Sequence, residues 1–561
     1  MAARAAATTE GMPTGSEGEA DGPLTRGLAL LHTLAEADGP VRAADLAHTT
    51  GLARSAVDRL TATLVHLGHL RQEGRDLEPA PRLMEFGNAY LRATGLPTVA
   101  QPPLDRVARV LDESVSLIVD DGGDMRIVAR AVPPERVIPL GFRVGDLLPA
   151  DRCAAGAVLA RDWTPERYAA WRARRAADPL DTGYPALPPR SAPGEAAVDE
   201  GRFRAWVADA AEAGWALDDQ IAAPGLVALC VPVEGGEGGP RYALSVLAHT
   251  SRRDAEGLRA HATAHLTAAA REVSDALART PDSAPEPYPA PLPYTDAKAE
   301  LGPLFLQSLA RGLAVLTALG SRRGGLTLNE TAQAVGLSYP STRRALLTLR
   351  ALGYVDQRGR HHLPAARTLG LGHARLAGLR LSDIVLPHLT ELAARAGESA
   401  SVAVLDGPEV RYLARSATRQ VTGVRIRPGT RLPAYATSMG RVLLADLPRA
   451  ERDRLLAALP PRPLTPYTRT SPVDLAELLR RTREDGYTLV EQELETGLRS
   501  MAAPLHDPRG TVVAALNLAL HAGPDTPDRS RDRLLPPLLA TARAIETDLS
   551  AVFAFTPVPP E

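Results

Sequence analysis

Leucines recur at helical spacing near the start of the chain and again in its middle. Residues three or four positions apart lie on one face of an α-helix, so each set predicts an amphipathic helix that buries its leucines. The two sets are Leu24, Leu28, Leu31 and Leu34, and Leu309, Leu313, Leu316 and Leu319.

Three further elements are predicted after each leucine helix: a short helix closed by a glycine, a third helix, and a polar hairpin with a Gly-Arg pair at its tip. This order of elements is typical of a winged helix-turn-helix domain. The predicted ranges are 43–50, 54–67 and 69–79 in the first region and 328–335, 339–352 and 354–364 in the second.

The two regions are versions of one segment. At a constant offset of 285 positions, Leu24-Thr25-Arg26-Gly27-Leu28 recurs as Leu309-Ala310-Arg311-Gly312-Leu313. Farther along, an offset of 272 brings Gly214 onto Gly486 and Gly225 onto Gly497. The chain is therefore interpreted as a tandem duplication of a two-domain unit.

The second domain of each copy is predicted to be an antiparallel sheet flanked by helices, which makes the fold class α+β. Two apolar strands flank a glycine turn, a helical stretch follows, and two more strands precede a closing helix. The strands are expected at 115–119, 127–131, 226–233 and 241–248, and at 402–405, 410–413, 498–505 and 511–520, with the helical stretches near 152–175 and 437–458.

Composition shifts mark the expected domain boundaries. A polar start without an apolar centre predicts a disordered tail, and Pro-rich stretches predict a linker and an inserted surface loop at 178–199. The expected organisation is a tail at 1–22, winged helix-turn-helix domains at 23–92 and 305–378, sheet domains at 93–276 and 379–555, and a linker at 277–304.

The 561 residues suit roughly four domains, and no apolar run approaches the roughly 18 residues of a membrane span. The two cysteines, Cys153 and Cys230, both fall in the first copy and give neither a disulfide framework nor metal spacing. We therefore expect a cytoplasmic protein without a metal or another cofactor.

Charge differs sharply between the two copies although the net charge of the chain is only −2. Residues 309–376 hold ten arginines against two acids, whereas residues 24–91 hold seven arginines against eight acids. A local basic surface is what nucleic acid requires, so the second copy is the better candidate for DNA binding.

The third helix of a helix-turn-helix lies in the major groove of DNA, and its first two turns meet the bases. Arginine on that helix can bind guanine with two hydrogen bonds or pair with phosphate. The candidates in the second copy are Arg311, Ser338, Tyr339, Ser341, Arg343, Arg344, Arg350, Arg358 and Arg360, and those in the first copy are Arg54 and Arg59.

Two observations weaken the candidates. Asp58 stands where the second copy has Arg343, so an acid would face the phosphates. Arginine also serves nearly every cationic role in this chain, since Lys298 is its only lysine, and such a cluster is also compatible with a merely solvated helix face.

Both copies resemble the IclR family of bacterial transcription regulators over nearly the whole chain. The matching motifs of the second copy include 308–316, Arg343-Arg344, 347–355, 429–441 and 491–500. The last two are similar to regulators of the protocatechuate (β-ketoadipate) branch of aromatic-acid breakdown.

The resemblance implies a GAF-like effector domain that binds a small carboxylate, and homo-oligomers on double-stranded operator DNA. The implied ligand-site residues are Thr437, Ser438, Met439, Gly440, Glu491, Glu493, Arg499, Ser500 and Asn517 in the second copy, and Asp218 and Ser245 in the first. Arg499 could pair an anionic ligand. The first copy departs from the pattern, with Asp151-Arg152-Cys153 in place of Tyr435-Ala436-Thr437.

The sequence favours a regulator that binds operator DNA mainly through its second winged helix. Both copies could instead read unequal half-sites, so that one chain imitates a dimer, or the first copy could be a scaffold. An enzyme would need a base within reach of Cys153, and no partner is suggested by spacing. The His361-His362 pair lies in the hairpin without a second ligand pair, so no catalytic residue or metal ligand is predicted.

Overall fold

The computed structural model describes residues 22–559 except 38, 134–141, 191–199, 236–238, 280–293, 418–425, 524 and 557. Residues 1–21 of the predicted tail and residues 280–293 of the Pro-rich linker therefore lie outside the described residues. The chain divides into two compact units, residues 1–377 and 378–561, which are described separately. In the described part of the chain, no helix combines the length and apolar character needed to cross a bilayer.

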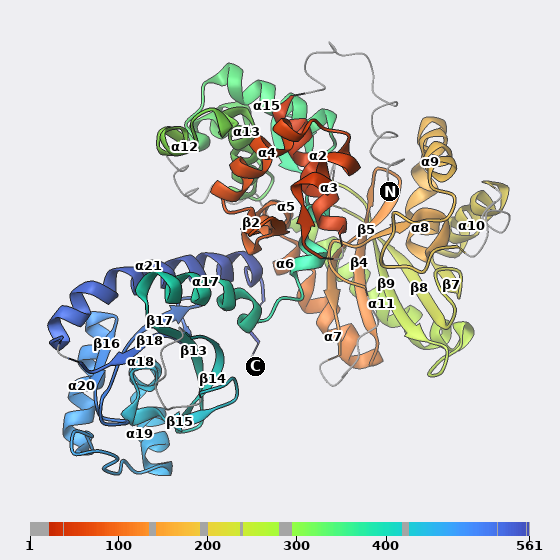
Figure 1. Cartoon of the computed structure of the whole chain (residues 1–561). Helices are drawn as coiled ribbons and strands as arrows, with labels where there is room; N and C mark the ends of the chain where they lie inside the picture. Colours follow the sequence, from red (N-terminus) through yellow and green to blue (C-terminus); the bar gives the residue numbers. More distant parts are fainter. Residues whose placement is uncertain are drawn as a thin grey trace. The chain divides into compact units, whose positions relative to one another are not determined.

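The first winged helix follows the predicted order (Figure 1). Helix α2 (Pro23–Glu36) buries its leucine face, and α3 (Ala43–Thr50) ends at Gly51, whose φ of 68° is readily adopted by glycine. Helix α4 (Arg54–His66) leads into the hairpin of β2 (Leu70–Glu73) and β3 (Asp76–Pro79). A short strand that the pattern missed, β1 (Val41–Arg42), extends this sheet in the order β1-β3-β2.

The second winged helix repeats the arrangement. Its elements are α13 (Gln307–Ala318), β10 (Leu326–Thr327), α14 (Leu328–Val335), α15 (Tyr339–Ala351), β11 (Val355–Arg358) and β12 (His361–Pro364). A capping box between Thr327 and Glu330 fixes the start of α14, because each side chain bonds a backbone N–H at the other end of the turn.

The two winged helices pack together within unit 1 through α2 and α13. A methyl group added at Gly27 would collide with the Leu309 side chain, and one added at Gly312 would collide with the Leu24 side chain. Glycine therefore allows each leucine to pack against the backbone of the opposite helix.

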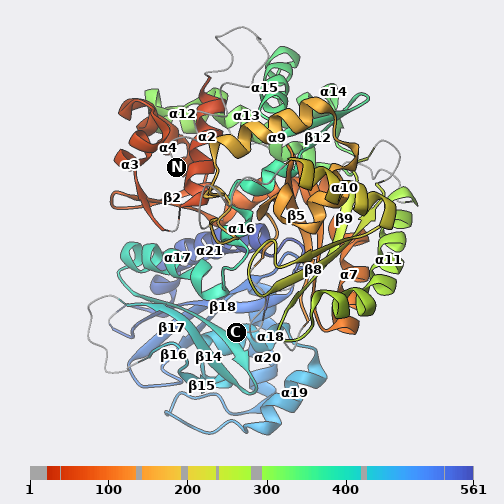
Figure 2. The same ribbon diagram turned by 90° about the vertical axis from the view of Figure 1, so that its right-hand side faces the viewer.

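The first sheet domain completes unit 1. Its strands are β4 (Ser114–Asp121), β5 (Asp124–Ala131), β6 (Leu147–Pro149), β7 (Ala216–Asp219), β8 (Leu226–Val233) and β9 (Tyr242–His249), in the antiparallel order β6-β5-β4-β9-β8-β7. Helices α7 (Gln101–Leu111) and α11 (Ala255–Arg279) lie next to each other on one face (Figure 2), and α8 (Ala154–Leu159) and α10 (Glu200–Ala213) lie on the other side, over an apolar core.

This first sheet domain also contacts the second winged helix. The Arg143 guanidinium donates to the Ala374 carbonyl at 3.3 Å, and Gly145 lies against the backbone of Leu369 and Ala374. The basic winged helix is therefore held by the first copy on two sides.

Unit 2 has the same sheet as the first copy. Its strands are β13 (Ser399–Asp406), β14 (Glu409–Ser416), β15 (Arg431–Pro433), β16 (Thr488–Glu491), β17 (Leu498–His506) and β18 (Val512–His521), in the order β15-β14-β13-β18-β17-β16. Helices α17 (Leu381–Ala396) and α21 (Pro527–Val552) cover one face, while α18 (Ser438–Asp446) and α20 (Pro472–Asp485) lie on the other (Figure 1).

The structure adds detail to the helical stretches and to the linker. The helical stretches near 152–175 and 437–458 each contain two helices, where α9 (Pro165–Ala177) and α19 (Arg449–Ala458) begin after a turn. Within the range of the linker, Tyr294–Leu301 forms helix α12.

Across residues 365–380, all of which are described, no long helix joins the second winged helix to its sheet domain. Only a 3-10 turn (Ala366–Gly370) and the one-turn helix α16 (His373–Leu376) form there. Gly372 has a φ of 112°, outside the helical region, whereas the first copy runs on as α5 (Glu85–Thr94).

Gly440→Ala tests the packing of α18. An added methyl group would collide with the backbone carbonyl of Ala434, so we expect the free energy of unfolding to fall by about 1–3 kcal/mol. Denaturant unfolding of the full chain measures this. Gly523→Ala is the control, because its added methyl group meets only ordinary contacts near 3.8 Å. Equal stability of the two variants would contradict the prediction.

Candidate DNA-binding surface and effector site

The outer face of α15 is basic and exposed. Thr342, Leu346 and Leu349 are buried on its inner face, which leaves Arg343 and Arg344 exposed on the other. Among the described residues neither arginine forms an ion pair. At the start of the helix, the hydroxyls of Ser338 and Ser341 hydrogen-bond at 3.0 Å, and Tyr339 is 53% exposed.

The hairpin extends this basic surface. Arg350 on α15 donates to the Gln357 amide oxygen at 2.6 Å, which ties the helix to the hairpin. Arg360 at the hairpin tip is exposed. Arg358 is also exposed. It lies close enough to Tyr242 of the first sheet domain to lower the pKa of that phenol, although burial raises the same pKa by more. Arg311 is not on this surface, because it lies half-buried on α13.

On the corresponding surface of the first copy, acids pair with several of the arginines. On α4, Asp58 accepts from the Arg54 Nε at 3.3 Å, one helical turn apart. In the hairpin, Asp76 pairs with Arg42 at 3.5 Å and Glu78 pairs with Arg71 at 3.5 Å. Arg59 is exposed. The two winged helices therefore share a fold but differ in the charge they present.

In unit 2, several predicted ligand-site residues gather between α18 and the sheet. Thr437 caps α18 by accepting from the Gly440 N–H at 3.1 Å. Ser438 Oγ hydrogen-bonds the side-chain amide of Asn517 on β18 at 2.9 Å. Ser500 on β17 pairs with Ala519, two residues beyond Asn517, so its side chain lies on the same face of the sheet. Met439 is buried in the adjoining core.

Glu493 is part of a buried ion pair beside these residues. It binds the guanidinium of Arg441, which is only 1% exposed, at 2.5 Å and also accepts from the Arg469 N–H at 2.9 Å. Arg441 also donates to the Tyr435 carbonyl at 3.2 Å. Arg441 was not among the predicted site residues, although it closes the 429–441 motif.

Arg499 and Glu491 lie on the opposite face of the sheet. Arg499 pairs with Glu491 and donates to Ser530 Oγ at 2.6 Å and the Asp525 carbonyl at 2.9 Å, both near the start of α21. Its guanidinium is therefore bound within the protein. The structure thus separates these two residues from Ser438, Ser500 and Asn517, and Arg499 does not have the orientation expected for pairing an anion there.

A hollow of about 220 Å³ on unit 2 lies elsewhere. It is lined by residues of α20, β16 and the first turn of α21, including Arg481 and Arg531. Both arginines pair with acids of their own helices. The hollow includes none of the predicted ligand-site residues.

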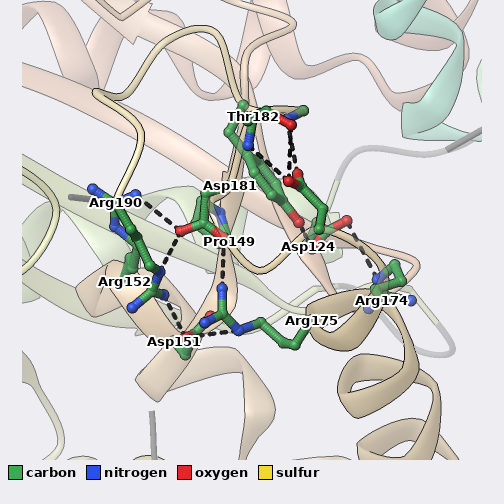
Figure 3. Close-up of polar contacts among 12 residues, drawn as sticks. Asp124, Pro149, Asp151, Arg152, Arg174, Arg175, Asp181, Thr182 and Arg190 are labelled. Atoms are coloured by element: carbon green, nitrogen blue, oxygen red, sulfur yellow. Dashed lines mark hydrogen bonds and ion pairs between the residues drawn. The ribbon is translucent and has the colours of Figure 1, made fainter. Parts of the chain in front are cut away.

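Where unit 2 has the buried Arg441–Glu493 ion pair, the first copy has a denser cluster of ion pairs (Figure 3). Asp181 binds Arg152, Arg175 and Arg190 at 2.9, 2.5 and 2.7 Å. Asp151 binds Arg190 at 2.7 Å, and Arg152 also donates to the Ala222 carbonyl at 2.6 Å. Much of the cluster comes from the inserted loop and α9. Comparison of equivalent positions in the two copies therefore could not predict it.

Asp218 and Ser245 lie on the same side of this sheet as α8. Asp218 is buried, and burial raises its pKa to about 7, although its carboxylate accepts from the Ile221 N–H at 2.7 Å. Ser245 pairs with Cys230 on the neighbouring strand. In the first copy, Ala154 and Ala228 stand where the second has Ser438 and Ser500, so fewer hydrogen-bonding groups remain.

Cys153 is poorly suited to be a nucleophile. Its thiol is buried, donates to the Pro149 carbonyl at 3.4 Å, and has a pKa raised by that burial. His361 and His362 lie side by side on β12, and burial lowers the pKa of His362. The described residues contain no cluster of side chains suited to a metal ion.

Comparison with known proteins accounts for nearly all of the described structure. Residues 23–74 and 308–359 match the IclR helix-turn-helix domain, and residues 88–180, 191–275 and 373–547 match the C-terminal domain of the bacterial transcriptional regulator IclR. The Pca regulon regulatory protein of Pseudomonas putida is 39% identical over 242 residues, which cover 43% of this chain and 83% of that protein.

Two further relatives are similar over one copy's length. The p-hydroxybenzoate hydroxylase transcriptional activator of Acinetobacter baylyi is 34% identical over 246 residues, 43% of this chain and 91% of the relative. A crystal structure of a Rhodococcus sp. RHA1 protein classed as a transcriptional regulator is 42% identical and covers 44% of this chain and 99% of its own, with a TM-score of 0.40. With both domain types matched twice, the chain belongs to the IclR family of bacterial transcriptional regulators.

Proposed function

We propose that this chain regulates transcription by binding operator DNA mainly through its second winged helix, in response to a small aromatic carboxylate bound beneath α18 in unit 2. The observation that supports DNA binding most directly is that the neighbouring Arg343 and Arg344 are exposed on α15 and form no ion pair with the described residues. Its helix is the one that enters the major groove in helix-turn-helix proteins.

Charge favours the second copy over the first. Phosphate contacts provide much of the affinity of such proteins, and arginine also discriminates guanine through paired hydrogen bonds. Helix α15 carries three arginines and no acid, whereas α4 carries two arginines and Asp58. The proposed contacts are therefore Arg343, Arg344 and Arg360, with Ser338, Tyr339 and Ser341 at the start of the helix.

The proposed effector site uses neutral hydrogen-bonding groups. Ser438 and Asn517 meet beneath the first turn of α18, Ser500 lies on the same face of the sheet, and the helix dipole there favours an anion. The nearby Arg441 is neutralised by Glu493, and Arg499 by Glu491 on the other face. A carboxylate would therefore be held by hydroxyl, amide and backbone donors.

The class of effector is inferred from relatives. Two similar proteins bear names that refer to the Pca regulon and to p-hydroxybenzoate hydroxylase. An aromatic acid also suits a site with polar groups on one side and the apolar side chains of Met439 and its neighbours on the other. To regulate, it must bind the two states of the protein with different affinities.

Arg343→Ala/Arg344→Ala tests the DNA-binding surface. We expect at least about a tenfold loss of affinity for the DNA upstream of the protein's own gene, because paired hydrogen bonds to a base are worth about 1–3 kcal/mol. The dependence on salt should become shallower by about one or two phosphate contacts. Fluorescence anisotropy over a salt series measures both.

Arg449→Ala/Arg529→Ala is the matched control, because these side chains are 87% and 80% exposed in unit 2. The control should bind DNA as the wild type does. Equal binding by all three proteins, or tight binding that ignores salt, would count against the proposed surface.

Ser438→Ala tests the effector site. Loss of one hydrogen bond should weaken binding of 4-hydroxybenzoate about fivefold to tenfold, given about 1 kcal/mol per bond. Titration calorimetry with the full chain measures the affinity, and thermal unfolding without ligand reports any loss of stability. Arg531→Ala, in the separate hollow, is the control. Weaker binding in the control but not in Ser438→Ala would move the site to the hollow.

A further inference from the structure

The contact between the two winged helices has the reciprocity of a two-fold interface. Leu24 of α2 packs on Gly312 of α13, and Leu309 of α13 packs on Gly27 of α2. The offset of 285 relates Leu24 to Leu309 and Gly27 to Gly312. In a two-fold interface residue i of one partner meets j of the other and j meets i, which is the pattern here. Both partners, however, belong to one chain.

Reciprocity extends to the helices that follow. The Arg375 guanidinium of the second copy donates to the Leu34 and Ala37 carbonyls at the end of α2, at 2.8 and 2.7 Å. In return, α5 of the first copy packs on the end of the α13 segment, where Gly320 meets Ala89 and the Gly324 N–H donates to the Ala93 carbonyl at 2.9 Å.

Further contacts tie α4 of the first copy to the segment that precedes α13. Thr63 of α4 accepts from the Leu306 N–H at 2.9 Å and donates to the Leu304 carbonyl at 3.2 Å, and His66 packs edge-on against Phe305. These partners directly precede α13 in the chain. A second chain offering its own α13 would have to displace α2 and this segment together.

The first winged helix, which packs on α13, carries less positive charge on its DNA-facing helix than the second winged helix does. Asp58 sits at the position of Arg343 and pairs with Arg54, and the hairpin acids Asp76 and Glu78 pair with Arg42 and Arg71. An acid on the groove-facing helix repels phosphate and removes the free cation beside it. The first winged helix thus keeps its pairing surface, while Asp58 stands in place of one arginine of the DNA-facing helix and pairs with another.

We propose that the first winged helix is a built-in, electrostatically silent partner of the second, and that Asp58 is the residue that silences it. This inference rests on the proposed function, because it assumes that α15 binds DNA. One chain then presents two helices to the same duplex: α15, which binds DNA, and α4, which does not. Its operator has a single strong half-site, in place of the two equal half-sites read by a symmetric dimer.

Asp58→Arg tests the role of Asp58. The change removes an acid and adds an arginine at the position of Arg343, so the silent helix should gain phosphate contact. We expect affinity for the upstream DNA to rise severalfold and the salt dependence to steepen by about one contact. Asp453→Arg is the matched control, because Asp453 is also exposed and pairs with an arginine four residues away on a helix of unit 2.

Arg54→Ala/Arg59→Ala completes the test and should leave binding nearly unchanged. If it weakens binding as much as Arg343→Ala/Arg344→Ala does, both copies read DNA and the silent-partner proposal is overturned. If Asp58→Arg behaves like Asp453→Arg, the first winged helix does not face the duplex and the proposal also fails. If Arg343→Ala/Arg344→Ala has no effect, the proposed function fails instead.

Leu24→Cys/Gly312→Cys tests whether pairing occurs within one chain. The two positions are in direct contact, close enough for a disulfide to form on mild oxidation. Peptide mapping and non-reducing electrophoresis of the full chain should find this disulfide in a species of single-chain mass. The wild type is the control, since Cys153 and Cys230 are buried. The same disulfide in a species of twice that mass would show pairing between chains and overturn the proposal.

Discussion

The close approach of α2 and α13 is the contact on which the arrangement of unit 1 depends. It is possible only because Gly27 and Gly312 lack side chains, so that Leu309 and Leu24 pack against helix backbone. Close-packed interiors leave no room for even one extra methyl group at such a point. The second winged helix is thereby fixed to the first, and Arg143 and Gly145 of the first sheet domain hold it from another side. Three of the four expected domains consequently belong to one compact unit.

The two sheet domains share one architecture, but a different buried arginine joins the region of α18 or α8 to the neighbouring loop in each. In unit 2, Arg441 joins α18 to Glu493 in the loop after β16. In the first copy, Arg152 precedes α8 and reaches the Ala222 carbonyl in the loop after β7. Burying a guanidinium is costly unless acceptors surround it, and each copy supplies them from different residues. In the first copy, Asp181 and Arg190 of the inserted loop complete the set of partners around Arg152.

Duplication within one chain allows the copies to divide the work that identical subunits must share. A symmetric dimer cannot change one recognition helix without changing the other, because both come from one sequence. Here Asp58 and Arg343 occupy equivalent positions with opposite charges. The same freedom applies to the sheet domains, where Ala154 and Ala228 stand against Ser438 and Ser500.

The sequence by itself determined the repeat, the winged helices, the sheet strands and the difference in charge between the copies, because periodicity and glycine positions are local signals. Helices α3 and α14 were predicted to the residue, and the family follows from long motifs. Only the tertiary structure decided which side chains meet. Arg499 and Ser500 are neighbours in the motif, yet alternation along β17 sends them to opposite faces of the sheet. The pairing of α2 with α13 and the cluster around Asp181 join residues far apart in the chain, and no periodic pattern encodes such contacts.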